Sequence, residues 1–284
     1  MHLVVCIKQV PDTAEVKIDP ETNTLVRAGV EAIANPYDVT ALEEAVRLKE
    51  KYGGKVTAVS MGPPQAESAL RQAFSMGADD IVLLSDRAFA GADTLASGYT
   101  LAMAVAALAK EDPVDLVLCG KQAIDGDTAQ TGPGIATRLG LTQFTYVVDV
   151  EWVDTAKRRI QVRRKVEGGF EIVNGPLPAL LSVELELARP RRASLPMLIG
   201  SLRAPVRVWD AAAIHASLQL VGIKGSPTWV RAIASPQIHR AGPRWDAEEG
   251  VSPAVSQALD ALFADKDFEA EFRKGWGNVI DKQE

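Results

Sequence analysis

The chain has 284 residues, 47% hydrophobic and 24% charged, with a formal net charge of −6. That size and composition fit one α/β domain with an appendage. The negative charge, without a basic stripe, argues against nucleic acid or anionic lipid as a partner. No apolar run reaches the roughly 18 residues that span a bilayer, and the N-terminus is a strand without a basic leader, so we expect a soluble, cytoplasmic protein with no direct membrane insertion.

The cysteines and histidines give no sign of a metal or catalytic centre. Cys6 and Cys119 each end an apolar run, which favours buried core thiols in a reducing compartment. The histidines, at positions 2, 215 and 239, are scattered and have no metal-ligand spacing. We therefore expect neither a structural zinc site nor a histidine-based triad.

The first half of the chain alternates predicted strands and helices. Apolar runs rich in β-branched residues predict strands buried on both faces at 3–7, 55–61, 80–84 and 115–120. Helical periodicity lies between them at 38–52, with Asp38 as a candidate N-cap, and at 64–76 and 93–110. The alternation predicts a Rossmann-like, doubly wound, mostly parallel sheet covered by helices.

The pattern changes after about residue 143. Segments 145–153 and 158–166 alternate polar and apolar residues, which predicts antiparallel additions, and 178–186 reads as one more buried strand. Segment 188–205 contains three prolines and is predicted to be an exposed loop. Residues 206–284, helical at 252–276, are too poor in strand signals for an independent domain, so we expect an arm that packs on a partner chain. The predicted division is 1–187, 188–205 and 206–284.

The segment "GKQAIDGDTAQTGPGIATRLG" at 120–140 joins a buried strand to a helix start. Ligands of doubly wound sheets bind at such positions, where a helix N-terminus offers free N–H groups to a phosphate. Gly126, Gly132 and Gly134 leave room for a ligand to approach the backbone. Thr128, Gln130 and Thr131 can donate hydrogen bonds to phosphate oxygens. Asp125 and Asp127 suit ribose hydroxyls or backbone N–H groups. A long turn without a ligand is the alternative, since neither standard phosphate-loop motif is present.

Four other polar turns are predicted at the same edge of the sheet. They are "KQVPDT" 8–13, "NPYD" 35–38, "SMGPP" 60–64 and "SDRAFAGADT" 85–94. Each has a purely structural explanation: Pro36 fixes a turn, Gly62 and Pro63 start a helix, and Asp93 can be an N-cap. Together they favour a binding site more than any one of them does.

The motifs "CIKQVPDTAEVKIDPETNTLVRAGV", "NPYDVTALEEAVRLKE", "VSMGPP", "SDRAFAGADTLA" and "GKQAIDGDTAQTGPGIA", in this order, resemble the β subunit of electron transfer flavoprotein. The resemblance covers roughly residues 1–205. "GSPT" at 225–228 is similar to the tail of the nitrogen-fixation-linked and electron-bifurcating branch. The resemblance implies an adenine-nucleotide-binding, HUP-like fold and a heterodimer with a larger α subunit, in which the flavin performs the redox chemistry. This subunit would be an electron carrier, and NADH oxidation would occur only in the heterodimer or a larger complex.

The resemblance also implies site residues. The phosphates of the nucleotide would bind Asp125, Gly126, Asp127, Thr128, Gln130, Thr131 and Gly132. The adenosine pocket would be lined by Cys6, Asn35, Pro36, Tyr37, Asp38 and Met61. The nucleotide is AMP in ordinary members and the ADP half of a second FAD in the bifurcating branch, whose loop matches Arg87, Phe89, Gly91, Ala92, Asp93 and Thr94 near the flavin.

Partners follow from the same resemblance. "RRASLP" at 191–196 matches the family's recognition loop, in which Leu195 would anchor an acyl-CoA dehydrogenase-like or quinone-reducing oxidoreductase. The following "MLIGSLRAPVRV" lacks the lysine cluster of familiar members, which leaves the identity of the dehydrogenase open. NADH is the expected electron donor, with ferredoxin or flavodoxin as a further acceptor.

Two classes of protein compete with an electron carrier. An ATP-binding stress-type regulator would use a similar sheet but would need neither the long tail nor the Arg-Pro-rich loop. An adenylating or ATP-pyrophosphatase-type enzyme would need a glycine-rich phosphate loop after the first strand, and "KQVPDT" is a poor substitute. A flavin spectrum of the purified complex would exclude both.

Overall fold

The structure is a computed structural model, and it describes residues 1–12, 17–18, 25–26, 32–229, 251–264, 266 and 268. The chain divides into two units, Met1–Ala234 and Ser235–Glu284. Most of the motif at 6–30 and much of the predicted arm lie outside the described residues. In the second unit the described helix is α6, Val251–Phe263, which covers the first half of the predicted helix at 252–276.

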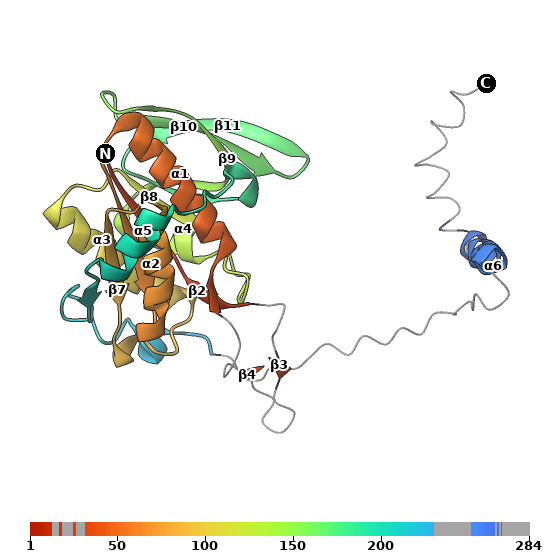
Figure 1. Cartoon of the computed structure of the whole chain (residues 1–284), viewed down its shortest axis with the longest axis horizontal. Helices are drawn as coiled ribbons and strands as arrows, with labels where there is room; N and C mark the ends of the chain where they lie inside the picture. The colour runs from red at the N-terminus through yellow and green to blue at the C-terminus, as the bar shows by residue number, and fades with distance from the viewer. Residues whose placement is uncertain are drawn as a thin grey trace. The chain divides into compact units, whose positions relative to one another are not determined.

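A nine-stranded sheet in the order β11-β10-β9-β12-β8-β1-β6-β7-β13 forms the first unit (Figure 1). Neighbours from β9 to β13 in this order run parallel, and β10 and β11 are antiparallel additions at one edge. The predicted antiparallel segments 145–153 and 158–166 correspond to β9 and β10, which pair antiparallel as expected, whereas β11 is not predicted. The strands are β1 His2–Cys6, β6 Lys55–Met61, β7 Asp80–Leu84, β8 Leu116–Gly120, β9 Thr142–Asp154, β10 Arg159–Val166, β11 Gly169–Pro176, β12 Ala179–Val183 and β13 Arg207–Trp209. Two short antiparallel pairs lie outside it, β2 Gln9–Pro11 with β5 Ala32–Ala34 and β3 Lys17–Ile18 with β4 Leu25–Val26.

Helices cover both faces of the sheet. On one face lie α1 Pro36–Tyr52, α2 Glu67–Met76 and α5 Leu195–Arg203, which cross in front of the strands in Figure 1. On the other lie α3 Thr94–Glu111 and α4 Thr131–Leu139. Strand β1 shows why the central runs are continuously apolar: Leu3 and Val5 enter the core under α1 and α2, whereas Val4 and Cys6 enter the core under α3 and α4. No helix in the described part of the chain is long and apolar enough to cross a membrane.

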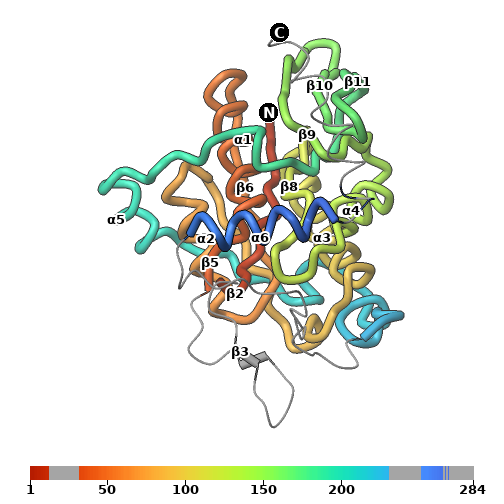
Figure 2. Tube along the Cα trace, turned by 90° about the vertical axis from the view of Figure 1, so that its right-hand side faces the viewer, coloured from red at the N-terminus to blue at the C-terminus, as the bar shows by residue number. Residues whose placement is uncertain are grey.

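The order of the strands reverses direction between β1 and β8. From β1 the sheet grows through β6 to β7 on one side, and through β8 to β12 on the other. Figure 2 shows β6 and β8 on either side of the N-terminal strand. Ligands of open α/β sheets bind beyond the carboxyl ends of the strands at such a switch point. The loops that follow β1 and β8 are therefore the place to look for a site.

One predicted loop contains a helix. Segment 188–205 was expected to have no regular element because of its prolines, but Leu195–Arg203 forms α5. The prediction was wrong because Pro196 lies in the first turn, where its missing N–H has no helical partner to lose. Pro205 stands two residues beyond the end of the helix, where a proline is common.

The first part of the predicted arm packs on its own chain. Strand β13 pairs with β7 at the edge of the sheet, and Ala211, Ile214 and Val221 are buried in the core beside α3. A three-residue strand gives almost no periodic signal, which explains why sequence patterning misses it. The expectation that an arm packs on another chain now concerns the residues after Trp229.

Candidate functional site

Asp38 joins three elements at the switch point. Its Oδ2 accepts a hydrogen bond from the backbone N–H of Lys8 at 2.9 Å, and its Oδ1 accepts one from the N–H of Gly120 at 2.8 Å. The first turn of α1 is thereby tied to the ends of β1 and β8. Asp38 is not the N-cap that the sequence suggests, because the helix begins earlier with Asn35 at that position. Burial raises the pKa of the Asp38 carboxyl to about 6.

Asn35 orders the loop that follows β8. Its side-chain Nδ2 donates to the carbonyl of Gln122 at 2.9 Å, and its Oδ1 accepts from the N–H of Ile124 at 3.3 Å. Its own N–H donates to the carbonyl of Lys8 at 2.8 Å. A buried asparagine thus holds the loops after β1 and β8 against each other, so the turn 35–38 and the loop 121–130 form one constellation.

The two carboxylates of this loop are both engaged by donors of the chain. Lys8 Nζ lies 2.7 Å from each carboxylate oxygen of Asp125. Gln122 Nε2 donates to Asp127 Oδ1 at 2.7 Å. The lysine neutralises the charge of Asp125, whereas Asp127 accepts a hydrogen bond from an uncharged amide and keeps its negative charge.

The backbone of the loop has an uncommon conformation just before α4. Asp127 and Ala129 have positive φ angles of 49° and 54°, which are uncommon for residues other than glycine. The helix α4 starts directly afterwards, and Gln130 makes no side-chain capping bond to its first N–H groups. A helix start without a side-chain cap leaves backbone N–H groups without a partner from that side chain, and such groups can bind an anion.

The start of α4 is closely packed on the sheet. A Cβ atom on Gly132 would lie 2.7 Å from Cys119 Sγ, whereas a Cβ on Gly126 would meet nothing within 4 Å. Cys119 and Cys6 are both buried, and burial raises the pKa of Cys6 to about 12, so neither is a reactive thiolate. Cys6 contributes to the core under α3 and α4, with half-buried Met61 packed against the same core.

The loop at 85–94 forms a hydrogen bond with the loop 121–130, called the phosphate-type loop below. Thr94 Oγ1 donates to Gln130 Oε1 at 3.0 Å, which joins the starts of α3 and α4. Asp93 caps α3, since its Oδ1 accepts from the N–H groups of Leu95 and Ala96, both at 3.0 Å. Its Oδ2 accepts from Thr228 Oγ1 at 2.8 Å, so the GSPT segment is attached here.

The other residues assigned to this loop have different environments. Phe89 is buried in the core, and a Cβ on Gly91 would lie 2.5 Å from Ile223 Cγ1. Arg87 is exposed and Ala92 is half-buried. Thr94 is therefore the residue of the predicted flavin loop that hydrogen-bonds to the phosphate-type loop, while Phe89, Gly91 and Asp93 have local packing or capping roles.

Sequence patterning missed a cation–aromatic cluster beside the site. Lys121, the first residue after β8, has its Nζ 3.0 Å from Glu184 Oε1. The same atom lies 5.4 Å from the ring centroid of Tyr37 and 5.6 Å from that of Tyr146. Tyr146 has a φ angle of 57° at an irregularity of β9, where a bulge redirects its side chain. The position of Lys121 directly after a buried strand was the one available signal.

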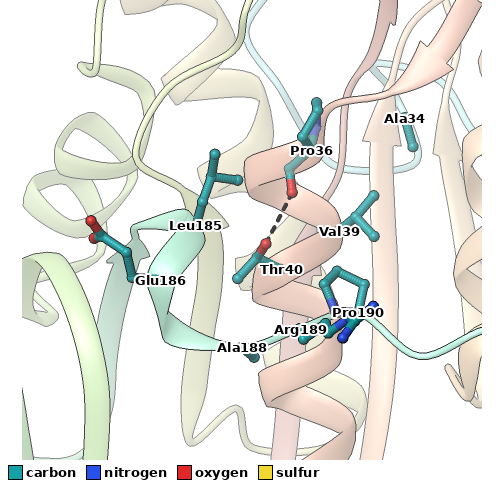
Figure 3. A pocket seen from close by; sticks show the side chains of 9 residues that line it. All are labelled: Ala34, Pro36, Val39, Thr40, Leu185, Glu186, Ala188, Arg189 and Pro190. Carbon is teal, nitrogen blue, oxygen red and sulfur yellow. Dashed lines mark hydrogen bonds between the residues drawn. The ribbon is translucent and has the colours of Figure 1, made fainter.

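A separate hollow of about 560 Å³ lies beside the first turns of α1 (Figure 3). Ala34, Pro36 and Val39 line one side, and Leu185 to Pro190 approach from the other. The hollow places the chain leading to the predicted recognition loop next to the predicted adenosine turn. Leu195 itself is 70% exposed, at the start of α5.

These features define the class of protein first: a doubly wound α/β protein whose polar loops meet at the switch point of the sheet. Among the described residues no group of three or more histidines, cysteines or carboxylates could hold a metal. The family model "Electron transfer flavoprotein domain" matches residues 22–214, and the chain belongs to this family.

Its relatives are similar along most of their length. The chain is 52% identical to "Protein FixA" of Azotobacter vinelandii, over 84% of this chain and 85% of the relative. It is 48% identical to "Electron transfer flavoprotein subunit beta" of Clostridium acetobutylicum, over 85% of this chain and 91% of the relative. It is 44% identical to the protein of the same name from Megasphaera elsdenii, over 94% of this chain and 99% of the relative.

Proposed function

We propose that the chain is the β-type subunit of a heterodimeric electron transfer flavoprotein. It pairs with a larger, flavin-bearing α subunit and passes electrons between NADH or a dehydrogenase and further acceptors. Similarity to β subunits over nearly their full length supports the pairing. The exposed apolar side chains of α6, among them Val255, Leu259 and Leu262, fit a segment that packs on another chain.

The loop 121–130 is the single observation that carries the nucleotide site. Its left-handed residues, the uncapped start of α4 and the pairing of Asp125 with Lys8 support a bound phosphate. Thr128 and Thr131 would supply hydroxyl donors there, and Tyr37 and Met61, both half-buried, would border the adenosine, while Asn35 holds the loop in place. The residues present fit an adenine nucleotide.

We propose further that this nucleotide is FAD, whose flavin supplies hydride and one-electron transfer, and that the heterodimer bifurcates electrons. The loop 85–94 supports FAD over AMP because it meets the phosphate-type loop through Thr94 and Gln130. Arg87, exposed on that loop, would stabilise negative charge on a reduced flavin. Structural AMP in a non-bifurcating carrier is the second candidate, because the loop 121–130 could bind the phosphate of AMP as well as the phosphates of FAD.

Nucleotide content decides between these candidates. The chain is co-expressed with its larger subunit, the heterodimer is purified, and the nucleotides are extracted and quantified. Two FAD per heterodimer is the expected result, whereas one FAD with one AMP would leave a simple carrier. A colourless, ATP-binding monomer would overturn the electron-carrier function and favour a stress-type regulator.

A further inference from the structure

Arg191 attaches the chain before α5 to helix α1. Its guanidinium donates from Nε and Nη2 to the two oxygens of Glu43 at 2.9 and 3.0 Å, and from Nη1 and Nη2 to those of Glu50 at 2.6 and 3.0 Å. Its backbone N–H donates to Glu43 Oε2 at 3.0 Å. Both carboxylates are thus bound in the bidentate geometry that arginine provides and lysine does not.

The burial of Glu43 makes this contact obligatory. Glu43 is 5% exposed, and a carboxylate so buried is costly unless it is paired. Glu50 lies two helical turns further along the same face of α1 and is exposed. Arg191 lowers the pKa of the Glu50 carboxyl through their hydrogen bonds. The contact therefore fixes the side chain of Arg191 and the main chain at that residue.

The far end of α5 has a second attachment. Arg71 of α2 donates to the carbonyl of Ser201 and pairs with Glu67 at 2.6 Å. The apolar side chains of α5 near these two attachments are open: Leu195, Leu198, Ile199 and Leu202 are 46–72% exposed. The main chain of this surface is fixed by two arginines, while its side chains stay free to contact a partner.

Helix α1 connects that surface to the candidate nucleotide site. It starts at the switch point with Asn35 and Asp38, and it carries Glu43 and Glu50 on its later turns. We propose that Arg191 is a positioning residue for electron transfer, which fixes the docking helix α5 relative to the nucleotide site through α1. The docking role of α5 rests on the proposed function together with the resemblance of 191–196 to the family's recognition loop, but the attachment itself does not.

A merely structural role for Arg191 predicts a different outcome from a positioning role. Loss of a structural contact would lower thermal stability and flavin content together. Loss of positioning would loosen α5 and weaken docking, while the nucleotide and its reactivity toward small molecules stay unchanged.

The test uses the co-expressed heterodimer with Arg191→Gln, Arg191→Lys and the pair Glu43→Gln with Glu50→Gln. Arg47→Gln is the matched control, since Arg47 lies on α1 and pairs within the helix with Glu44. Hydrogen exchange is measured at 192–203 and in strands β1 and β8. Electron transfer is measured with an acyl-CoA dehydrogenase that reduces the wild-type complex, and with a small dye as a docking-independent acceptor.

We expect Arg191→Gln to speed hydrogen exchange at 192–203 about tenfold or more. The apparent KM for the dehydrogenase should rise about tenfold or more as well. The kcat, the rate of dye reduction and hydrogen exchange in β1 and β8 should stay unchanged. Arg191→Lys should show a smaller effect of the same kind, and Arg47→Gln none. Unchanged exchange at 192–203 would overturn the attachment. Faster exchange with an unchanged KM would overturn the positioning role. If the wild-type complex exchanges no electrons with any dehydrogenase, the proposed function is contradicted, and so is the positioning role. The hydrogen-exchange data would still show whether Arg191 holds the segment 192–203 on α1.

Discussion

Lys8 Nζ lies 2.7 Å from both carboxylate oxygens of Asp125, so an ion pair joins the loops that follow β1 and β8. The two residues are 117 positions apart in sequence, and they meet because β1 and β8 are neighbours at the switch point. The pair lies where the proposed phosphates would bind.

Lys8→Gln should therefore weaken nucleotide binding. It removes a positive charge and leaves Asp125 uncompensated next to a phosphate, so we expect the Kd for AMP or FAD to rise about tenfold or more. Asp125→Asn should have a smaller effect because the lysine stays. Titration of nucleotide-stripped heterodimer measures both. Lys55→Gln is the control, because Lys55 pairs with Asp112 at 3.0 Å at the amino ends of the strands, away from the proposed site. Equal Kd values for the Lys8 and Lys55 variants would contradict a role for Lys8.

Gly132→Ala should disturb the same site from below. The new methyl group would lie 2.7 Å from Cys119 Sγ, so α4 must shift away from the sheet, at a cost of about 1–3 kcal/mol. That shift moves the N–H groups that would face the phosphates, and we expect both a lower unfolding temperature and a lower nucleotide content. In Gly126→Ala the new methyl group meets no atom within 4 Å. This variant should therefore lower the unfolding temperature and the nucleotide content less than Gly132→Ala does. Equal behaviour of the two variants would argue against a tight fit at Gly132.

The sequence predicts the parallel part of the fold well because each central strand is buried on both faces. Val4 and Val5 of β1 point to opposite cores, and that burial leaves a continuous apolar run that can be recognised without the structure. Strand β11 is not predicted, because Phe170 and Ile172 are exposed on an edge strand and the segment lacks a buried alternation. Helix α5 is not predicted because its prolines suggest a loop.

The candidate site was predictable in part for a similar reason. Its glycines, threonines and aspartates stand together in one loop, which marks the loop as unusual. The partners of that loop come from distant positions: Lys8, Asn35 and Thr94 are brought to it by strand order and by the packing of α3 on α4. No spacing along the chain encodes those contacts, so the roles of Lys8 and Thr228 become visible only in three dimensions.

Leu195→Ala should slow electron exchange with a protein partner. Leu195 is 70% exposed, so its truncation costs the chain little stability, while a central docking residue contributes about 2 kcal/mol or more to binding. We expect slower reduction by the dehydrogenase at unchanged flavin content. Leu218→Ala, which removes a 55% exposed leucine outside α5, is the control. Wild-type kinetics in the Leu195 variant would remove this residue from the docking surface.

Stability should fall as the pH rises from about 5 to 7, because of Glu44. Burial raises the pKa of its carboxyl to about 7 from 4.5; Arg47 opposes the shift, and Asp149 and Glu43 add to it. The folded state therefore holds this proton more tightly than the unfolded state. The stabilisation is complete below the unfolded pKa and is lost as the pH rises through the folded pKa. For one buried carboxyl the loss is about 2–3 kcal/mol. Asp38, with its pKa raised to about 6, acts in the same direction.

Glu44→Gln tests this directly, because glutamine keeps the shape of the side chain and cannot ionise. It gives up the ion pair with Arg47, whose side chain is 55% exposed, so that loss is below about 1 kcal/mol. We expect the variant heterodimer to be more stable than wild type at pH 8 and to show a flatter dependence of unfolding temperature on pH between 5 and 7. Glu167→Gln, at an exposed position after β10, should keep the wild-type slope. If Glu44→Gln keeps that slope as well, the carboxyl of Glu44 is ionised in the folded protein at pH 5, and its burial does not govern the pH dependence.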